Sequence, residues 1–126
     1  MRDGSDVAIL ATGASVAQAI AAHDLLKEQG VSAQVLNMHT IKPIDRQAIE
    51  AAATRIGRIL TVEEHFVAGG LGGAVAEILA ELGTGRLRRL GLEDEFIMDV
   101  AAYPEILKLA GLDAASIATA ARSLVP

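Results

Sequence analysis

The chain has no cysteine and few aromatic residues among its 126 positions. The absence of cysteine excludes disulfide bonds, thiol catalysis and zinc sites built on thiolates. Aromatic residues make up 2% of the chain, whereas hydrophobic residues of all kinds make up 52%. We therefore expect a core of Ala, Val, Ile and Leu side chains, which suits close packing of helices on a sheet. Such a chain buries enough apolar surface to offset its conformational entropy, so disorder is not expected.

The sequence also lacks an excess of basic residues and any long apolar run. Its net charge is −5 and its longest basic run is Arg88-Arg89, so a nucleic-acid-binding face is not expected. No stretch reaches the roughly 18 consecutive apolar residues that indicate a membrane span. Residues 1–6 are polar and acidic, unlike a secretory signal, which makes a cytoplasmic location our expectation. The length fits one domain spanning residues 1–126.

Short apolar runs alternate with segments of helical periodicity along the chain. The runs at 7–11, 33–38, 58–63 and 87–92 predict strands, the last of them more polar and nearer an edge, while 96–102 is either a loop or a short extra strand. Helices are predicted over 15–29, after Asp45, from the glycines at 69–73, from Pro104 to Gly111 and after Asp113, with Ser15, Asp45 and Asp113 as N-caps. This alternation predicts an α/β fold, a doubly wound and mostly parallel sheet with helices on both faces.

The most conspicuous polar cluster is Glu63-Glu64-His65, which comes after the third predicted strand. Ligands of such sheets collect at the carboxyl ends of the strands, and a carboxylate beside an imidazole can perform general acid–base catalysis. On an extended chain Glu63 and His65 share one side and Glu64 points to the other. No hydroxyl nucleophile with a known signature stands beside them, and the spacing of a multidentate metal site is missing. We favour a structural or interface role and predict no catalytic or metal-binding residue.

The second candidate is the glycine-rich segment Gly69-Gly70-Leu71-Gly72-Gly73 at the start of a predicted helix. Free backbone N–H groups and the helix dipole at such a start can hold an anion. The segment matches neither the P-loop nor the dinucleotide fingerprint. We favour the alternative, in which the glycines permit a tight loop and a close approach of helix to sheet.

Weaker signals come from the first strand–helix turn, two histidines and three arginines. The turn Thr12-Gly13-Ala14-Ser15 has a single glycine, so a dinucleotide site is not favoured there. His23 lies near the apolar stripe of the first helix and is expected to be packed, whereas His39 ends the second strand and is expected to make a structural hydrogen bond. The remaining prediction is that Arg86, Arg88 and Arg89 are solvated or paired with Glu93, Asp94 or Glu95.

Several segments together resemble the C-terminal domain of transketolases, especially of transketolases split into two subunits. The matching segments are 6–13, 39–45, 61–65, 69–77, Gly91 with Asp94-Glu95-Phe96, and Gly111-Leu112-Asp113. The combination of Thr40-Ile41-Lys42-Pro43 with Val62-Glu63-Glu64-His65 and a glycine-rich helix start is specific. Residues 2–6 resemble the linker before this domain in longer relatives, so Met1 falls at a domain boundary, as in an excised fragment or a split subunit. Ile97-Met98-Asp99-Val100 departs from the small loop usual in the family, which leaves the sugar substrate open.

The resemblance implies a five-stranded sheet and a domain that is catalytically incomplete by itself. In that family, thiamin diphosphate and a divalent ion lie between the first two domains, which also supply the catalytic glutamate, so no cofactor is expected in this chain. Glu63, Glu64, His65 and the glycines would be packing or interdomain positions. The implied partners are the thiamin-binding domains or subunit of the same enzyme and further copies of the chain in a homo-oligomer. The implied reaction moves a two-carbon ketol unit between sugar phosphates, as in the pentose phosphate pathway.

Other assignments stay open at this point. The same domain occurs in deoxyxylulose-phosphate synthase and in the β subunit of 2-oxo-acid dehydrogenases, which share the architecture. An autonomous module that binds a phosphorylated metabolite at the glycines, and a plain oligomerisation module, are two alternatives of a different class.

Overall fold

The structure is a computed structural model that describes residues 1–94 and 101–126. Its elements are β1 (Val7–Ala11), α1 (Ser15–Glu28), β2 (Ala33–Asn37), α2 (Arg46–Arg55), β3 (Arg58–Phe66), α3 (Leu71–Leu82), β4 (Arg86–Leu92), α4 (Tyr103–Leu109) and α5 (Ala114–Arg122). Within the described ranges the strands form one parallel sheet of four in the order β2-β1-β3-β4. The predicted α/β fold is confirmed. The candidate extra strand at 96–102 lies mostly outside the described residues.

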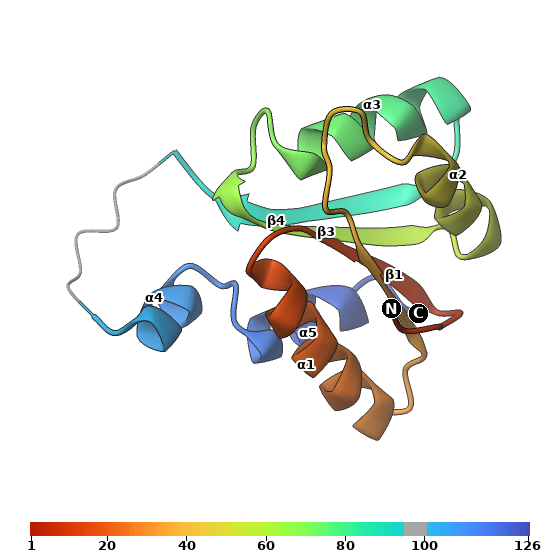
Figure 1. Cartoon of the computed structure of the whole chain (residues 1–126). Coiled ribbons are helices and arrows are strands. Elements are labelled where there is room, and N and C mark those ends of the chain that lie inside the picture. The colour runs from red at the N-terminus through yellow and green to blue at the C-terminus, as the bar shows by residue number, and fades with distance from the viewer. Residues whose placement is uncertain (95–100) are drawn as a thin grey trace.

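The chain winds from β1 outward to β2, returns past β1 to β3 and continues to β4. This order places α1 and α5 on one face of the sheet and α2 and α3 on the other (Figure 1). The central strand β1 is buried along its whole length. Its residues Val7, Ile9 and Ala11 join the core under α1 and α5, whereas Ala8 and Leu10 join the core under α2 and α3. Two separate cores explain why β1 is a continuous apolar run.

Among the described residues, the buried hydrophobic side chains are aliphatic apart from Met38, as expected from the composition. Ile9, Leu10, Leu60, Leu71 and Ile117 are among the largest of the fully buried ones. Burial of each such side chain stabilises the fold by about 1.5–3 kcal/mol relative to exposure. The sequence therefore carries enough aliphatic material to close both faces of the sheet.

Two of the three predicted N-caps are confirmed and one is wrong. The carboxylate of Asp45 accepts a hydrogen bond from Ala48 N at 3.0 Å, and that of Asp113 accepts one from Ser116 N at 3.3 Å. Ser15 is instead the first residue inside α1, after Ala14 at the N-cap position. Its hydroxyl is buried and has no hydrogen-bond partner in the described part of the chain. It cannot cap the helix because it already belongs to the first turn.

The two edges of the sheet differ. Residues before β1 run along the outer side of β2, where Arg2 pairs antiparallel with Val35 through two backbone hydrogen bonds of 3.2 and 2.9 Å. β4 lies at the opposite edge of the described sheet, as its polar sequence predicts.

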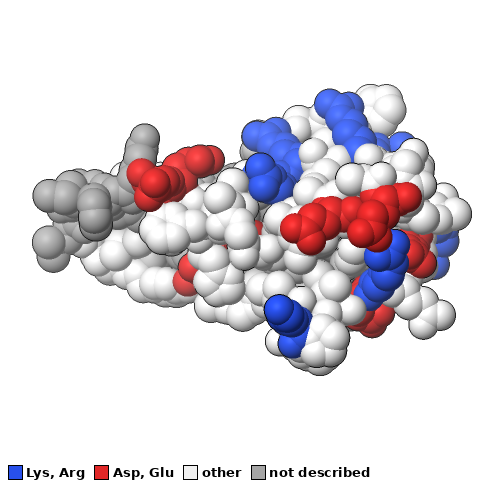
Figure 2. Space-filling model, turned by 90° about the horizontal axis from the view of Figure 1, so that it is seen from above, with Lys and Arg blue, Asp and Glu red and all other residues white. Residues whose placement is uncertain are grey.

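The surface over α2 and α3 mixes both signs of charge. Figure 2 shows basic and acidic side chains interspersed on this face, without a single basic patch. Arg46 of α2, for example, contacts both Glu50 of its own helix and Glu81 of α3, at 2.7 and 2.6 Å. No helix among the described residues has the length and apolar character that crossing a membrane requires.

Candidate functional site

The cluster Glu63-Glu64-His65 lies inside β3 rather than after it, because the strand continues to Phe66. β4 runs alongside this extension and pairs Leu92 with Phe66, after a register irregularity between Val62 and Phe66. The predicted end at residue 63 was therefore too early. The polar side chains of the cluster belong to the carboxyl-terminal end of the strand, where ligands of such sheets collect.

The Glu63 side chain is completely buried and bonded to the start of α3. Its Oε2 accepts a hydrogen bond from Leu71 N at 2.6 Å, and its Oε1 accepts one from Gly72 N at 2.8 Å. The first N–H groups of a helix have no partner within the helix, and the helix dipole favours a negative charge beside them. Glu63 is thus an anion supplied by the chain itself to the N-terminus of α3.

Two of the four predicted glycines lie where a side chain would meet close neighbours. A Cβ on Gly70 would lie 2.0 Å from Oε2 of Glu63, and a Cβ on Gly72 would lie 2.8 Å from Cδ of Arg89. Gly69 has a φ of +83°, a conformation that favours glycine, whereas a Cβ on Gly73 would meet no atom within 4 Å. Gly70 therefore lets α3 approach the Glu63 carboxylate, Gly72 lets the helix approach Thr61 and Arg89 of β3 and β4, and Gly69 shapes the loop before the helix.

The other two residues of the cluster lie on opposite sides of the strand. Nδ1 of His65 is 3.3 Å from Oε2 of Glu63, so these two side chains share a side, as the alternation of an extended chain requires. Glu64 instead accepts a hydrogen bond from the hydroxyl of Tyr103 on α4. This bond stabilises the neutral phenol and raises the pKa of Tyr103 above its ordinary value. β3 therefore connects to α3 through Glu63 and to α4 through Glu64.

The geometry limits the chemistry that the cluster can perform. Both oxygens of Glu63 already accept backbone hydrogen bonds, and the side chain has no exposed surface from which to meet a substrate. In the part of the chain that the structure describes, no three His, Asp or Glu side chains gather in a group that could hold a metal ion. The α3 N-terminus also does not suit a diphosphate, because the fixed charge of Glu63 repels an anion there. The Glu63 cluster and the start of α3 therefore do not fit thiamin diphosphate with its divalent ion.

The remaining predicted side chains make local contacts. Nδ1 of His23 lies 2.8 Å from the carbonyl oxygen of Ala33, and Nδ1 of His39 lies 2.7 Å from Oγ1 of Thr40. Arg88 donates to Ser123 Oγ and Arg89 donates to the carbonyl of Val67, at 2.7 and 3.3 Å. Among the described residues these arginines form no ion pair with Glu93 or Asp94, and Glu95 lies outside them.

The sequence analysis did not predict two features of the surface, a set of exposed apolar side chains and a pocket. The first consists of the exposed apolar side chains Phe66, Tyr103 and Leu109, which are 54%, 52% and 60% exposed. Phe66 ends β3, and the other two lie on α4, which packs against the core through the buried Leu107 (Figure 1). The scarcity of aromatic residues was a usable signal, because an aromatic residue left out of the core usually has another role.

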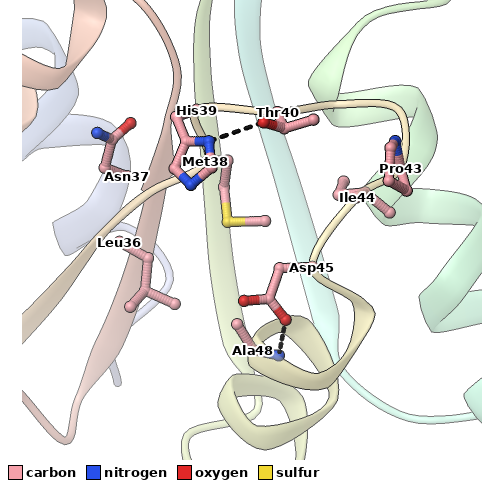
Figure 3. A pocket seen from close by; sticks show the side chains of 9 residues that line it. All are labelled: Leu36, Asn37, Met38, His39, Thr40, Pro43, Ile44, Asp45 and Ala48. Atoms are coloured by element: carbon pink, nitrogen blue, oxygen red, sulfur yellow. Dashed lines mark hydrogen bonds between the residues drawn. The ribbon is translucent and has the colours of Figure 1, made fainter.

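The second missed feature is a pocket of about 410 Å³ between the end of β2 and the start of α2. It is lined by Leu36, Asn37, Met38, His39, Thr40, Pro43, Ile44, Asp45 and Ala48 (Figure 3). No sequence signal predicted it, because its walls come from a strand, a loop and a helix that each have an ordinary pattern.

Comparison with known proteins shows one domain family for the chain. Residues 1–117 match the family described as "Transketolase, C-terminal domain". The chain is 46% identical over 117 residues to a putative transketolase C-terminal section from Methanocaldococcus jannaschii, which spans 92% of this chain and 36% of that protein. It is 48% identical over 120 residues to a 1-deoxy-D-xylulose-5-phosphate synthase from Thermomicrobium roseum, over 94% of this chain and 19% of that protein. A 6-deoxy-6-sulfo-D-fructose transketolase subunit from a Clostridium species is 43% identical, over 98% of this chain and 38% of that protein.

Solved structures agree with these sequence matches. A structure titled "Split gene transketolase, inactive beta4 tetramer" superposes with a TM-score of 0.91 at 35% identity, covering 98% of this chain and 40% of that one. A transketolase from Pichia stipitis shares the fold, with a TM-score of 0.69 at 24% identity. The chain thus spans from 19% to 38% of the length of the three curated relatives named above.

Proposed function

The chain belongs to the transketolase C-terminal domain family, and from this premise we propose that it is the assembly domain of a transketolase-type enzyme. In this proposal it docks onto the part of the enzyme that binds thiamin diphosphate and a divalent ion, and it contributes no catalytic residue. Thiamin diphosphate and the ion belong to that partner part. Relatives that are up to about five times longer than the matched segment support a larger enzyme.

The observation that carries the proposal is the internal use of Glu63. This carboxylate is the most conspicuous candidate acid or base in the chain, and it is buried and bonded to Leu71 N and Gly72 N. A buried carboxylate with two backbone donors stabilises the junction of β3 and α3 and has no free oxygen for a substrate. The carboxyl-terminal end of β3, where ligands of such sheets usually bind, is therefore better suited to a structural role than to catalysis.

The exposed apolar side chains of Phe66, Tyr103 and Leu109 support a docking role. Full burial of an exposed side chain of this size yields about 1.5–3 kcal/mol, and buried aromatic anchors dominate many interfaces. Phe66 lies at the carboxyl-terminal end of β3, close in sequence to Glu63, and Tyr103 and Leu109 lie on α4. Docking at this end would place the domain against its partner through a surface held in position by both Glu63 and Glu64.

The proposal also includes a homo-oligomer of the chain and a cytoplasmic location. The related structure is titled a beta4 tetramer, which supports a homo-oligomer for this chain as well. A cytoplasmic location fits sugar-phosphate chemistry.

Two reactions of the complete enzyme are candidates. The matches to transketolase sections and subunits favour transfer of a two-carbon ketol unit between sugar phosphates, as in the pentose phosphate pathway. The 48% identity to a 1-deoxy-D-xylulose-5-phosphate synthase favours the synthesis of 1-deoxy-D-xylulose 5-phosphate.

Calorimetric titration of the chain with thiamin diphosphate and Mg²⁺ tests the proposal that the partner part, and not this chain, binds the cofactor. We expect no binding to the chain alone, and stoichiometric micromolar binding would contradict the proposal. The chain is then mixed with the thiamin-binding part encoded in the same genome, and co-elution is measured by size-exclusion chromatography. Assays of the mixture for ketol transfer and for 1-deoxy-D-xylulose 5-phosphate distinguish the two candidate reactions.

A further inference from the structure

The pocket at the end of β2 combines apolar walls with one carboxylate. Leu36 and Met38 line it from the strand side, and Ile44 and Ala48 line it from the loop and from α2. In Figure 3 the Met38 side chain points into the space between strand and helix, and the Asp45 carboxylate lies below it. At about 410 Å³ the pocket falls within the range of specific binding pockets.

Asp45 uses one of its two carboxylate oxygens within the domain. Oδ1 accepts the capping hydrogen bond from Ala48 N, and the other oxygen makes no hydrogen bond or ion pair with any described residue. The neighbouring Arg46 does not neutralise it, because Arg46 is bound to Glu50 and Glu81. The pocket therefore offers one carboxylate oxygen that has no partner among the described residues.

These walls and this charge select the chemistry of an occupant. A phosphate or carboxylate would be repelled by Asp45, and a purely apolar group would desolvate the carboxylate without a partner. Lysine and arginine side chains instead place an aliphatic stem against apolar walls and a cationic head beside a carboxylate. His39 and Asn37 line the same pocket and add polar atoms at which such a head can donate.

We infer that this pocket is a socket for a lysine or arginine side chain of the thiamin-binding part of the enzyme. The inference rests on the function proposed above and names one anchor of that interface. The chain's net charge of −5 complements a basic contact on the partner. The socket lies at the carboxyl end of β2, so it belongs to the same edge of the sheet as the Glu63 junction.

Two variants test the socket in the complex of the chain with its thiamin-binding part. Asp45→Asn removes the charge but keeps an N-cap for α2, because asparagine caps as well as aspartate. Ala48→Lys places a cation of the chain's own on the wall of the pocket and so competes with the partner's. Asp113→Asn is the matched control, since Asp113 caps α5 in the same way and does not line the pocket.

The dissociation constant is measured by calorimetry at several salt concentrations. We expect Asp45→Asn and Ala48→Lys to weaken binding by about tenfold and to flatten its salt dependence, as the loss of a close charge pair does. Asp113→Asn should bind like the wild type. Wild-type affinity and salt dependence in both pocket variants would overturn the socket and leave the proposed function standing. A wild-type chain that does not bind the partner at all would overturn the proposed function and the socket together.

Discussion

At the scale of single residues, the buried carboxylate of Glu63 organises the carboxyl end of β3. Glu63→Ala should lower the free energy of unfolding by about 2–5 kcal/mol, because two buried N–H groups lose their acceptor and a void remains. Glu63→Gln should cost less, since an amide oxygen still accepts one of the two bonds from Leu71 N and Gly72 N. Urea unfolding measures both effects. Glu77→Ala, at an exposed carboxylate of α3, is the control, and an unchanged midpoint for Glu63→Ala would contradict this account.

The glycines before and within α3 provide a second residue-scale prediction. Gly70→Ala should destabilise the domain by about 2 kcal/mol or more, because its Cβ would fall 2.0 Å from Oε2 of Glu63. Gly73→Ala should be neutral or stabilise by up to about 1 kcal/mol, since alanine favours a helix and its Cβ meets nothing within 4 Å. Thermal unfolding compares the two variants. Equal melting temperatures would show that the close approach of Gly70 to the Glu63 carboxylate is not required for stability.

At the scale of elements, α4 is tied to β3 by a side-chain bond that titrates. Tyr103 on α4 donates to Glu64 on β3, and this bond raises the pKa of the phenol. A raised folded-state pKa means that the bond stabilises the folded state fully below the ordinary value of about 10 and is lost as the pH rises through the higher value. Docking of α4 should therefore weaken only in strongly alkaline solution.

The single tyrosine and the absence of tryptophan make this titration directly visible. The ultraviolet absorbance of tyrosinate should report a pKa above about 10 for Tyr103 in the wild type and a value near about 10 in Glu64→Ala, which removes the acceptor. Glu105→Gln on the same helix is the control and should titrate like the wild type. Identical titration curves for wild type and Glu64→Ala would rule out the bond in solution.

At the scale of the whole molecule, apolar side chains are buried on both faces of the sheet and exposed at the end of β3 and on α4. Both faces of the sheet are covered by aliphatic side chains, whereas Phe66 at the end of β3 and Leu109 on α4 remain exposed. This separation means that substitutions at the exposed end should change association much more than stability.

The double variant Phe66→Ser with Leu109→Ser tests that separation. We expect it to weaken binding to the thiamin-binding part by at least about tenfold, because two anchors of about 1.5–3 kcal/mol each are lost. Its melting temperature should stay within a few degrees of the wild type. Lys108→Ser, on the same helix and exposed, is the control that should bind normally. Unchanged binding by the double variant would exclude this end as the docking surface.

The sequence by itself determined the order and type of the elements. Apolar runs and helical periods depend on neighbouring residues, so the strands at 7–11 and 33–37 and the caps Asp45 and Asp113 could be predicted locally. The start of α1 could not be placed in this way. Ser15 was predicted as its N-cap from the turn residues, but it is the first residue inside the helix. The end of β3 was also missed, because pairing with β4 extends it through polar residues.

Only the tertiary structure decided what the polar residues do. Glu63 and the glycines were two separate candidates in the sequence, and the fold joins them by bringing α3 onto the end of β3. The exposure of Phe66 and the pocket beside Asp45 likewise depend on segments that meet across the domain. The physical reason is the range of the interactions. Backbone propensity acts over a few residues, whereas the partner of a buried charge is whichever group the packing of distant elements places within hydrogen-bond distance.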